Sequence, residues 1–217
     1  MTTAFARDKP RIGWIGLGKM GLPICERLAA RQFDVTTFAR NPEGRARAAN
    51  SNLRRETTIR DVVTGAQIIV SAVSDDPALL DIVFQNGGLK DSLNSSQIFV
   101  EISTVSPDAS RRVAEAMSAI GVDYVRSPVS GSTVTAAQGA LTAVLSGRPV
   151  AIERLQDFYA AFTRQTSRAG NTVRCRSSRR FANSTKWRSP TVVASSIFSC
   201  SLGKPPGSPV SRGGVQK

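Results

Sequence analysis

RIGWIGLGKMGLPICERLAARQ, residues 11–32, is the stretch that decides the fold of this chain. It begins as a compact apolar run, which predicts a buried strand, and continues with apolar residues on one helical face. The turn between the two reads GxGxxG and comprises Gly16, Leu17, Gly18, Lys19, Met20 and Gly21. Glycines at this spacing permit a tight turn, backbone approach to a pyrophosphate and close helix–strand packing. The turn therefore predicts a dinucleotide-binding site at a helix N-terminus.

Strand-like and helix-like stretches alternate after this turn. The sequence predicts strands at 34–40, 66–73 and 97–103, and helices at 57–65, 76–84, 107–120 and 149–162. Such alternation is typical of a doubly wound, Rossmann-type α/β fold with a mainly parallel sheet. We expect this NAD(P)-binding domain over residues 11–165, after an N-terminal lead of residues 1–10.

The C-terminal part has a different composition. The chain of 217 residues has 29 basic and 16 acidic residues, a net charge of +13. Residues 171–217 contain nine of the basic residues, none of the acidic ones and ten serines. Polar, charged composition of this kind favours disorder. Residues 166–217 are therefore predicted to be a basic, Ser/Arg-rich tail without regular structure.

Composition also excludes several kinds of chemistry. Histidine is absent, which excludes an imidazole base and histidine-bound metals, so no metal site is expected. The cysteines, Cys25, Cys175 and Cys200, are too far apart for a disulfide framework or a zinc site, which favours a reducing, cytoplasmic location. No apolar run reaches the roughly 18 residues of a membrane helix, and no membrane partner is expected.

The end of the second strand predicts which dinucleotide binds. NAD-binding folds usually place an acid about 20 residues past the glycines, but here Ala39 is neutral and is followed by Arg40 and Asn41. A guanidinium suits the 2′-phosphate of NADP through charge-assisted, bidentate hydrogen bonds. Arg40 therefore predicts NADP in preference to NAD; the alternative is a solvated arginine at a strand end.

Four segments together resemble the β-hydroxyacid dehydrogenase family, which includes 3-hydroxyisobutyrate dehydrogenase. They are GWIGLGKMGLPICERLA (13–29), FARNP (38–42), VEISTVSPDASRRVAEAM (100–117) and DYVRSPVSGSTVTAAQGALTAVLSG (123–147). The resemblance implies a nucleotide-binding domain, then a long connecting helix and an all-helical second domain. It also implies hydride transfer between the nicotinamide and a small hydroxy acid or semialdehyde.

The resemblance assigns roles to individual residues. It implies that Arg40 and Asn41 hold the adenosine phosphate, that Val73 and Ser74 border the ribose, and that Thr104 lies near the nicotinamide. The substrate-binding residues that it implies are Ser103, Ser130, Gly131 and Ser132, although the family usually has a second glycine in place of Ser132. The alternatives are an ordinary polar turn for Ser130 and Ser132, and a helix-leading turn for Thr104.

The family's catalytic lysine has no counterpart at its expected place. It should fall near Ser177 to Arg180, where the chain reads Ser177-Ser178-Arg179-Arg180. Arginine cannot exchange a proton near neutral pH. Lys186 is a weak candidate, about eight positions late, so we expect no catalytic residue and little or no activity. We interpret the chain as truncated: the tail replaces the family's helical domain, and an out-of-frame translation would explain its composition.

Three other functions stay open at this point. The chain could be a non-catalytic NADP-binding module, because it keeps the cofactor motifs and lacks the proton donor. Nucleic-acid binding through the basic tail is disfavoured, because the tail has no stacking motif or helix-turn-helix. An imine reductase would also lack the lysine, but VEISTVSP (100–107) is typical of the hydroxyacid enzymes. The sequence does not identify the hydroxy acid or tell whether the chain forms a homo-oligomer.

Overall fold

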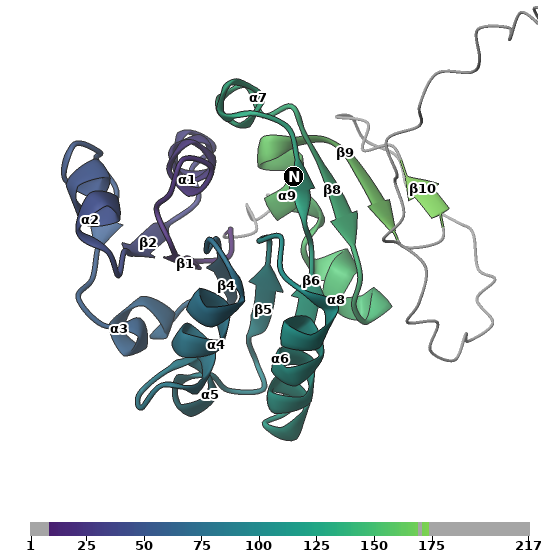
Figure 1. Ribbon diagram of the computed structural model, residues 1–217. Helices are drawn as coiled ribbons and strands as arrows, with labels where there is room; N and C mark the ends of the chain where they lie inside the picture. Colours follow the sequence, from purple (N-terminus) through teal and green to yellow (C-terminus); the bar gives the residue numbers. More distant parts are fainter. Residues whose placement is uncertain (1–8, 169–170, 174–217) are drawn as a thin grey trace, which may run out of the picture. The chain divides into compact units, whose positions relative to one another are not determined.

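A six-stranded parallel sheet forms the frame of the molecule in this computed structural model, which describes residues 9–168 and 171–173 (Figure 1). The strand order is β3-β2-β1-β4-β5-β6. The strands are β1 Ile12–Ile15, β2 Val35–Phe38, β3 Arg54–Arg55, β4 Ile68–Ser71, β5 Ile98–Glu101 and β6 Asp123–Arg126. The order reverses between β1 and β4, which is where doubly wound folds bind ligands. The predicted Rossmann-type fold is therefore confirmed.

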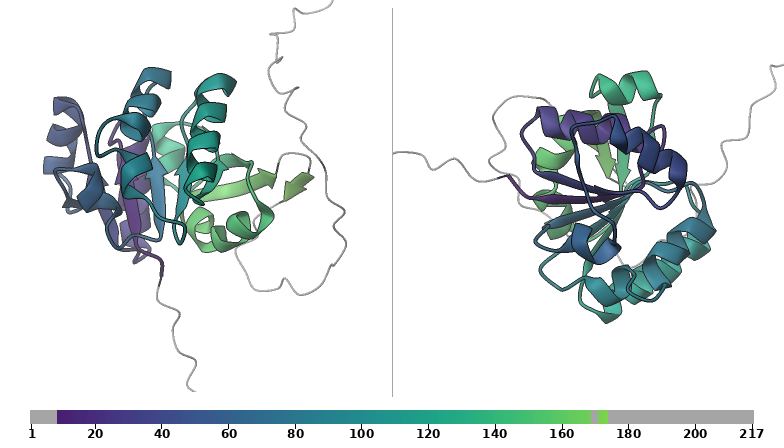
Figure 2. Two further views of the ribbon diagram at one scale, coloured as in Figure 1. Left: turned by 90° about the horizontal axis from the view of Figure 1, so that it is seen from below. Right: turned by 90° about the vertical axis from the view of Figure 1, so that its left-hand side faces the viewer.

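Helices cover both faces of this sheet because strand residues alternate in direction (Figure 2). Ile68 and Val70 belong to one apolar cluster, which includes residues of α1 and α2, whereas Ile69 belongs to the other, with residues of α3 to α6. The helices are α1 Gly21–Ala30, α2 Pro42–Ala49, α3 Ile59–Val63, α4 Asp76–Phe84, α5 Leu89–Ser92 and α6 Pro107–Ala119. In α6, Val113 and Met117 are buried.

A second, mixed sheet follows β6, which the alternation of strands and helices did not predict. Its order is β10-β9-β8-β7, and only β8 and β9 pair in parallel. Its strands are β7 Val129–Ser130, β8 Leu141–Leu145, β9 Thr163–Arg168 and β10 Asn171–Val173, and its neighbouring helices are α7 Thr133–Ala137, α8 Pro149–Arg154 and α9 Gln156–Phe162. Strand β9 continues past residue 165, the predicted C-terminal boundary of the domain.

The predicted helix over 149–162 is two helices. Leu155 ends α8 and precedes α9 with φ −94° and ψ 5°, outside the regular helical geometry. The break lets Phe158, Tyr159 and Phe162 pack together in the core, with ring centroids 5.0–5.6 Å apart. Helices α2 and α7 and the two-residue strand β3 were not predicted from the sequence.

Several predictions about the tail fall outside the described residues, including those on Cys175, Lys186 and Cys200. Within the described part of the chain, Cys25 is a free, buried cysteine, and burial raises the pKa of its thiol. The helices of this part are all too short or too polar to cross a membrane. The same residues contain no group of three or more acidic, cysteine or histidine side chains that could hold a metal ion.

Candidate dinucleotide-binding site

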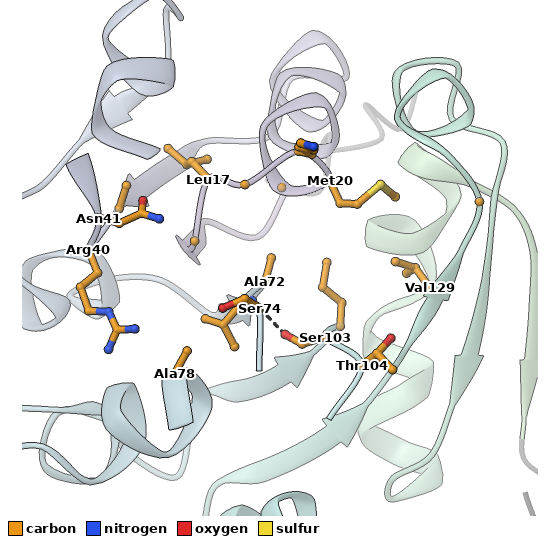
Figure 3. Close-up of a pocket in the computed structure, with 18 residues that line it drawn as sticks. Leu17, Met20, Arg40, Asn41, Ala72, Ser74, Ala78, Ser103, Thr104 and Val129 are labelled. Carbon is orange, nitrogen blue, oxygen red and sulfur yellow. Dashed lines mark hydrogen bonds between the residues drawn. The ribbon is translucent and has the colours of Figure 1, made fainter. Parts of the chain in front are cut away.

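A cleft of about 520 Å³ opens beside the β1–α1 turn. Residues after β1, β2, β4 and β5 line it, together with residues of the second sheet (Figure 3). Thirteen of the predicted site residues line this one cleft: Gly16, Leu17, Gly18, Lys19, Met20, Gly21, Arg40, Asn41, Val73, Ser74, Ser103, Thr104 and Gly131. Segments that are far apart in the sequence therefore form one continuous wall.

The three glycines of the turn have different steric surroundings. Gly16 has φ +101°, and a Cβ there would lie 2.2 Å from the carbonyl oxygen of Ala72. A Cβ on Gly21 would lie 2.3 Å from the Gly16 carbonyl oxygen, so helix and strand approach too closely for a side chain. A Cβ on Gly18 would meet no atom within 4 Å. Gly16 and Gly21 are thus required by the fold, whereas Gly18 leaves space in the cleft.

The N-terminus of α1 is suited to an anion. Its N-cap, Met20, makes no side-chain capping hydrogen bond, and the first turn has no acidic residue. In contrast, helices α2, α3, α4, α6 and α7 are capped by the side chains of Asn41, Thr58, Asp75, Ser106 and Ser132. An uncapped helix start presents N–H groups and partial positive charge. A pyrophosphate would satisfy both.

Arg40 lies at the end of the cleft where the adenosine is expected. Its guanidinium forms an ion pair with the carboxylate of Asp81 in α4, and its carbonyl oxygen accepts a hydrogen bond from Arg45. The side chain of Asn41 accepts a hydrogen bond of 2.8 Å from Gly44 N and caps α2. Arg40 therefore brings positive charge to the cleft, while the Asn41 side chain holds α2.

Hydrogen bonds connect the loops that follow β4 and β5. Val73 N donates to Ser103 Oγ over 2.9 Å, and Ser103 N donates to Glu101 Oε1. Glu101 is fully buried, and its Oε2 has no hydrogen-bond partner among the described residues. Burial raises the pKa of this carboxyl to about 7. Glu101 thus holds the turn at Ser103 and Thr104 from inside the protein.

Of the predicted substrate residues, Ser103 follows β5, and the other three lie at the edge of the second sheet. Gly131 lines the cleft, with φ +145°. Ser130 is in β7, paired with Thr142, and it lies outside the cleft lining, as does Ser132. The hydroxyl of Ser132 accepts a hydrogen bond of 3.3 Å from Thr135 N and so caps α7. Its proposed contact with a substrate stays a prediction.

The cleft contains few groups that could exchange a proton. Among its 18 described lining residues, the ionisable side chains are Lys19 and Arg40. Tyr159 is buried in the core, and Tyr124 packs against Phe99 with ring centroids 5.6 Å apart. Burial raises the pKa of both tyrosines. None of these residues therefore turns toward the cleft a side chain that could act as a base at neutral pH.

Sequence reasoning missed the apolar part of the lining and the partners behind it. The missed lining residues are Ala39, Ala72, Ala78, Ile102 and Val129. Ala72 and Ile102 directly follow β4 and β5, so the rule that ligands bind at the carboxyl ends of parallel strands could have found them. Asp81 carried no such signal, because it is 41 residues from Arg40 along the chain.

Comparisons with known proteins agree with this geometry. Residues 11–173 match the family model described as the NAD binding domain of 6-phosphogluconate dehydrogenase. The chain is 33% identical over 152 residues to 2-hydroxy-3-oxopropionate reductase of Escherichia coli strain K12, covering 69% of this chain and 51% of that protein. It is 28% identical over 162 residues to an NAD-dependent L-serine dehydrogenase of Pseudomonas aeruginosa, covering 74% and 54%. The chain thus spans about half the length of these curated relatives.

Solved structures show the same fold. The complex of Psf3 with NADP+ and 2-OPP matches with a TM-score of 0.69 and 29% identity, over 73% of this chain and 56% of that one. The 3-hydroxyisobutyrate dehydrogenase of Mycobacterium tuberculosis matches with a TM-score of 0.69 over 75% and 55%, and at 20% identity it supports the fold alone. The chain therefore belongs to the family of the NAD-binding domain of 6-phosphogluconate dehydrogenase, and the curated proteins that it resembles include a reductase and a dehydrogenase.

Proposed function

We propose that this chain is an NADP-dependent oxidoreductase domain of the 3-hydroxyisobutyrate dehydrogenase type. Its reaction is hydride transfer between the nicotinamide and a small β-hydroxy acid or semialdehyde. The observation that carries the proposal is the turn at residues 16–21, where Gly18 leaves open space beside an uncapped helix N-terminus. Both features fit a pyrophosphate, because the backbone can approach it and the positive end of the helix attracts it.

The cofactor, when bound, supplies or accepts the hydride, and the residues of the chain bind and orient it. We assign the pyrophosphate to residues 16–21 and the 2′-phosphate to Arg40. Val73 and Ser74 border the ribose, and Thr104 lies beside the nicotinamide. Psf3, which is 29% identical to this chain, is solved with NADP+, which supports this choice of dinucleotide.

For the substrate, we assign its carboxylate to hydroxyl and backbone N–H groups of Ser103, Ser130, Gly131 and Ser132. Gly131 and Ser103 line the cleft, which supports this end as the substrate end. The hydroxyl of Ser103 is held by Val73 N, so the pocket wall is fixed before a ligand arrives. We further propose that the protein acts in the cytoplasm.

We expect slow turnover from the 217-residue chain. Oxidation of a hydroxyl requires loss of its proton while the hydride leaves, and a positioned acid/base contributes typically about 10²–10⁴-fold. Lys19, in the phosphate turn, is the one described lining residue with a side chain that could exchange a proton. Glu101 is buried behind Ser103, outside the cleft lining. The chain should therefore bind cofactor well and react slowly.

A titration combined with a turnover assay tests this proposal. The full chain is titrated with NADP+ and NAD+ and then assayed with 3-hydroxyisobutyrate, glycerate and 4-hydroxybutyrate. We expect binding, tighter for NADP+, with slow turnover. Absence of binding would reject the proposal. Turnover of about 1–10³ per second would show an unrecognised proton donor, and loss of that activity in Lys186→Ala would identify it.

The second candidate is a non-catalytic NADP-binding module, which the lack of a base in the described cleft favours. The same assay separates the two functions. Slow turnover above the enzyme-free rate that disappears in Gly18→Val supports the oxidoreductase. Binding with no turnover above that rate supports the binding module.

A further inference from the structure

The cation expected to select NADP is already paired in the structure. Arg40 Nη1 forms an ion pair with Asp81 Oδ2, and the two side chains are 50% and 43% exposed. Asp81 is three residues after Ala78, which lines the cleft, and residues three apart lie on the same face of a helix. Figure 3 shows the Arg40 side chain extended toward the helix that carries Ala78. Helix α4 therefore holds Arg40 from the opposite wall of the cleft.

The charge and the backbone of Arg40 also interact with neighbouring residues. Hydrogen bonds from Ser74 and from Ala78 N lower the pKa of Asp75, and the charge of Arg40 adds to this effect. The carbonyl oxygen of Arg40 accepts a hydrogen bond from Arg45. The charge of Arg40 thus acts on Asp75, but the side chain of Asp75 caps α4, and the ion pair of the guanidinium is with Asp81. Asp81 is the carboxylate that a ligand would have to replace.

A 2′-phosphate and the Asp81 carboxylate compete for the same guanidinium. A phosphate monoester carries a charge of about −1.5 to −2 at pH 7 and offers three strong acceptor oxygens. NADP must displace Asp81 or share Arg40 with it, whereas NAD, which has a neutral 2′-hydroxyl, leaves the ion pair intact. We propose that Asp81 is a specificity-determining residue, whose competition for Arg40 limits the preference for NADP over NAD. This inference rests on the proposed function.

Removal of the Asp81 carboxylate tests this role. The full chain is titrated by calorimetry with NADP+ and NAD+ as wild type, Asp81→Asn, Arg40→Ala and the double variant. Asp108→Asn is the matched control, because Asp108 is an exposed aspartate of α6 paired with Arg111 at 2.8 Å. We expect Asp81→Asn to raise the ratio of NADP+ to NAD+ affinity about three- to fivefold, the size of a typical exposed ion pair. In the Arg40→Ala background the rise should be below about twofold, within the spread of non-interacting sites.

Each other outcome overturns the inference. A fall in the ratio in Asp81→Asn would mean that Asp81 orients Arg40 for the phosphate, and an unchanged ratio would mean that Asp81 has no influence. An equal rise with and without Arg40 would mean that Asp81 acts on the phosphate directly. Failure of the wild-type chain to bind either dinucleotide would reject the proposed function and this inference together, whereas binding of both with an unchanged ratio rejects only the role of Asp81.

Discussion

The two ends of the cleft are built in different ways. At the proposed pyrophosphate end, backbone forms the site: two glycines fix the turn, a third leaves space, and the start of α1 carries partial positive charge without a side-chain cap. At the proposed substrate end, side chains on separate elements must meet, and they are held by hydrogen bonds among Val73, Ser103 and Glu101. The first kind of site needs only a local conformation. The second needs correct placement of side chains and a proton donor, which the described lining residues do not include beyond Lys19.

The largest effect that we predict separates the roles of two glycines in the turn, Gly16 and Gly18. Gly16→Ala should destabilise the chain by about 3 kcal/mol or more, because its Cβ would lie 2.2 Å from a backbone oxygen at φ +101°. Gly18→Ala should change the free energy of unfolding by only about 0.5 kcal/mol, because its Cβ meets no atom within 4 Å. Urea unfolding followed by circular dichroism measures both. Equal stabilities would contradict the division of roles between the two glycines.

The next prediction concerns Glu101, beneath the substrate end. Burial raises its pKa from 4.5 to about 7, so the folded state binds the proton more tightly than the unfolded state. Between pH 4.5 and pH 7, the wild-type chain should therefore lose stability as pH rises, by up to about 3 kcal/mol relative to Glu101→Gln, and the difference should be constant above pH 7.

Urea unfolding at pH 5, 6, 7 and 8 checks this prediction. Glu115→Gln, which changes an exposed glutamate of α6, controls for the loss of one carboxylate. If the difference in stability between wild type and Glu101→Gln did not change with pH, the carboxyl would titrate alike in both states, and its burial would not govern its charge.

The smallest effect concerns the adenosine end. Arg40→Ala should lower the ratio of NADP+ to NAD+ affinity about tenfold. A charge-assisted hydrogen bond contributes about 1.5–3 kcal/mol, and the loss of an exposed ion pair with Asp81 offsets up to about 1 kcal/mol of it. Fluorescence titration with NADPH and NADH measures the ratio. If the wild-type chain and Arg40→Ala had the same ratio of NADP+ to NAD+ affinity, residues other than Arg40 would select the dinucleotide.

Local patterns made the pyrophosphate end predictable. The glycine spacing and the apolar strand before it are both contained in residues 11–32, and the α1 and β1 expected there are observed. Helix α2 was missed because only Gly44 and Ala48 of its eight residues are buried, which leaves no apolar periodicity. Strand β3 was missed because it consists of two exposed arginines, Arg54 and Arg55.

Contacts through space were not predictable in this way. The pairing of Arg40 with Asp81 joins residues from two elements, and no local pattern marks either as a partner. The hydrogen bond from Val73 N to Ser103 Oγ likewise joins the loops after two neighbouring strands, β4 and β5. The second sheet was missed because it mixes parallel and antiparallel pairs, whereas regular alternation of strands and helices predicts only parallel ones. Sequence patterns thus predicted elements better than they predicted which side chains meet.

The most direct test of a backbone-built pyrophosphate site is the affinity of Gly18→Val for NADP+, measured by calorimetric titration beside the wild type. The branched side chain would start in the open space of the cleft, since its Cβ has no neighbour within 4 Å. We predict that NADP+ binding falls by about 100-fold or more, roughly 2.7 kcal/mol, while the thermal unfolding temperature stays within a few degrees of the wild type. Wild-type affinity in a folded Gly18→Val variant would contradict the account, because the pyrophosphate would then bind elsewhere.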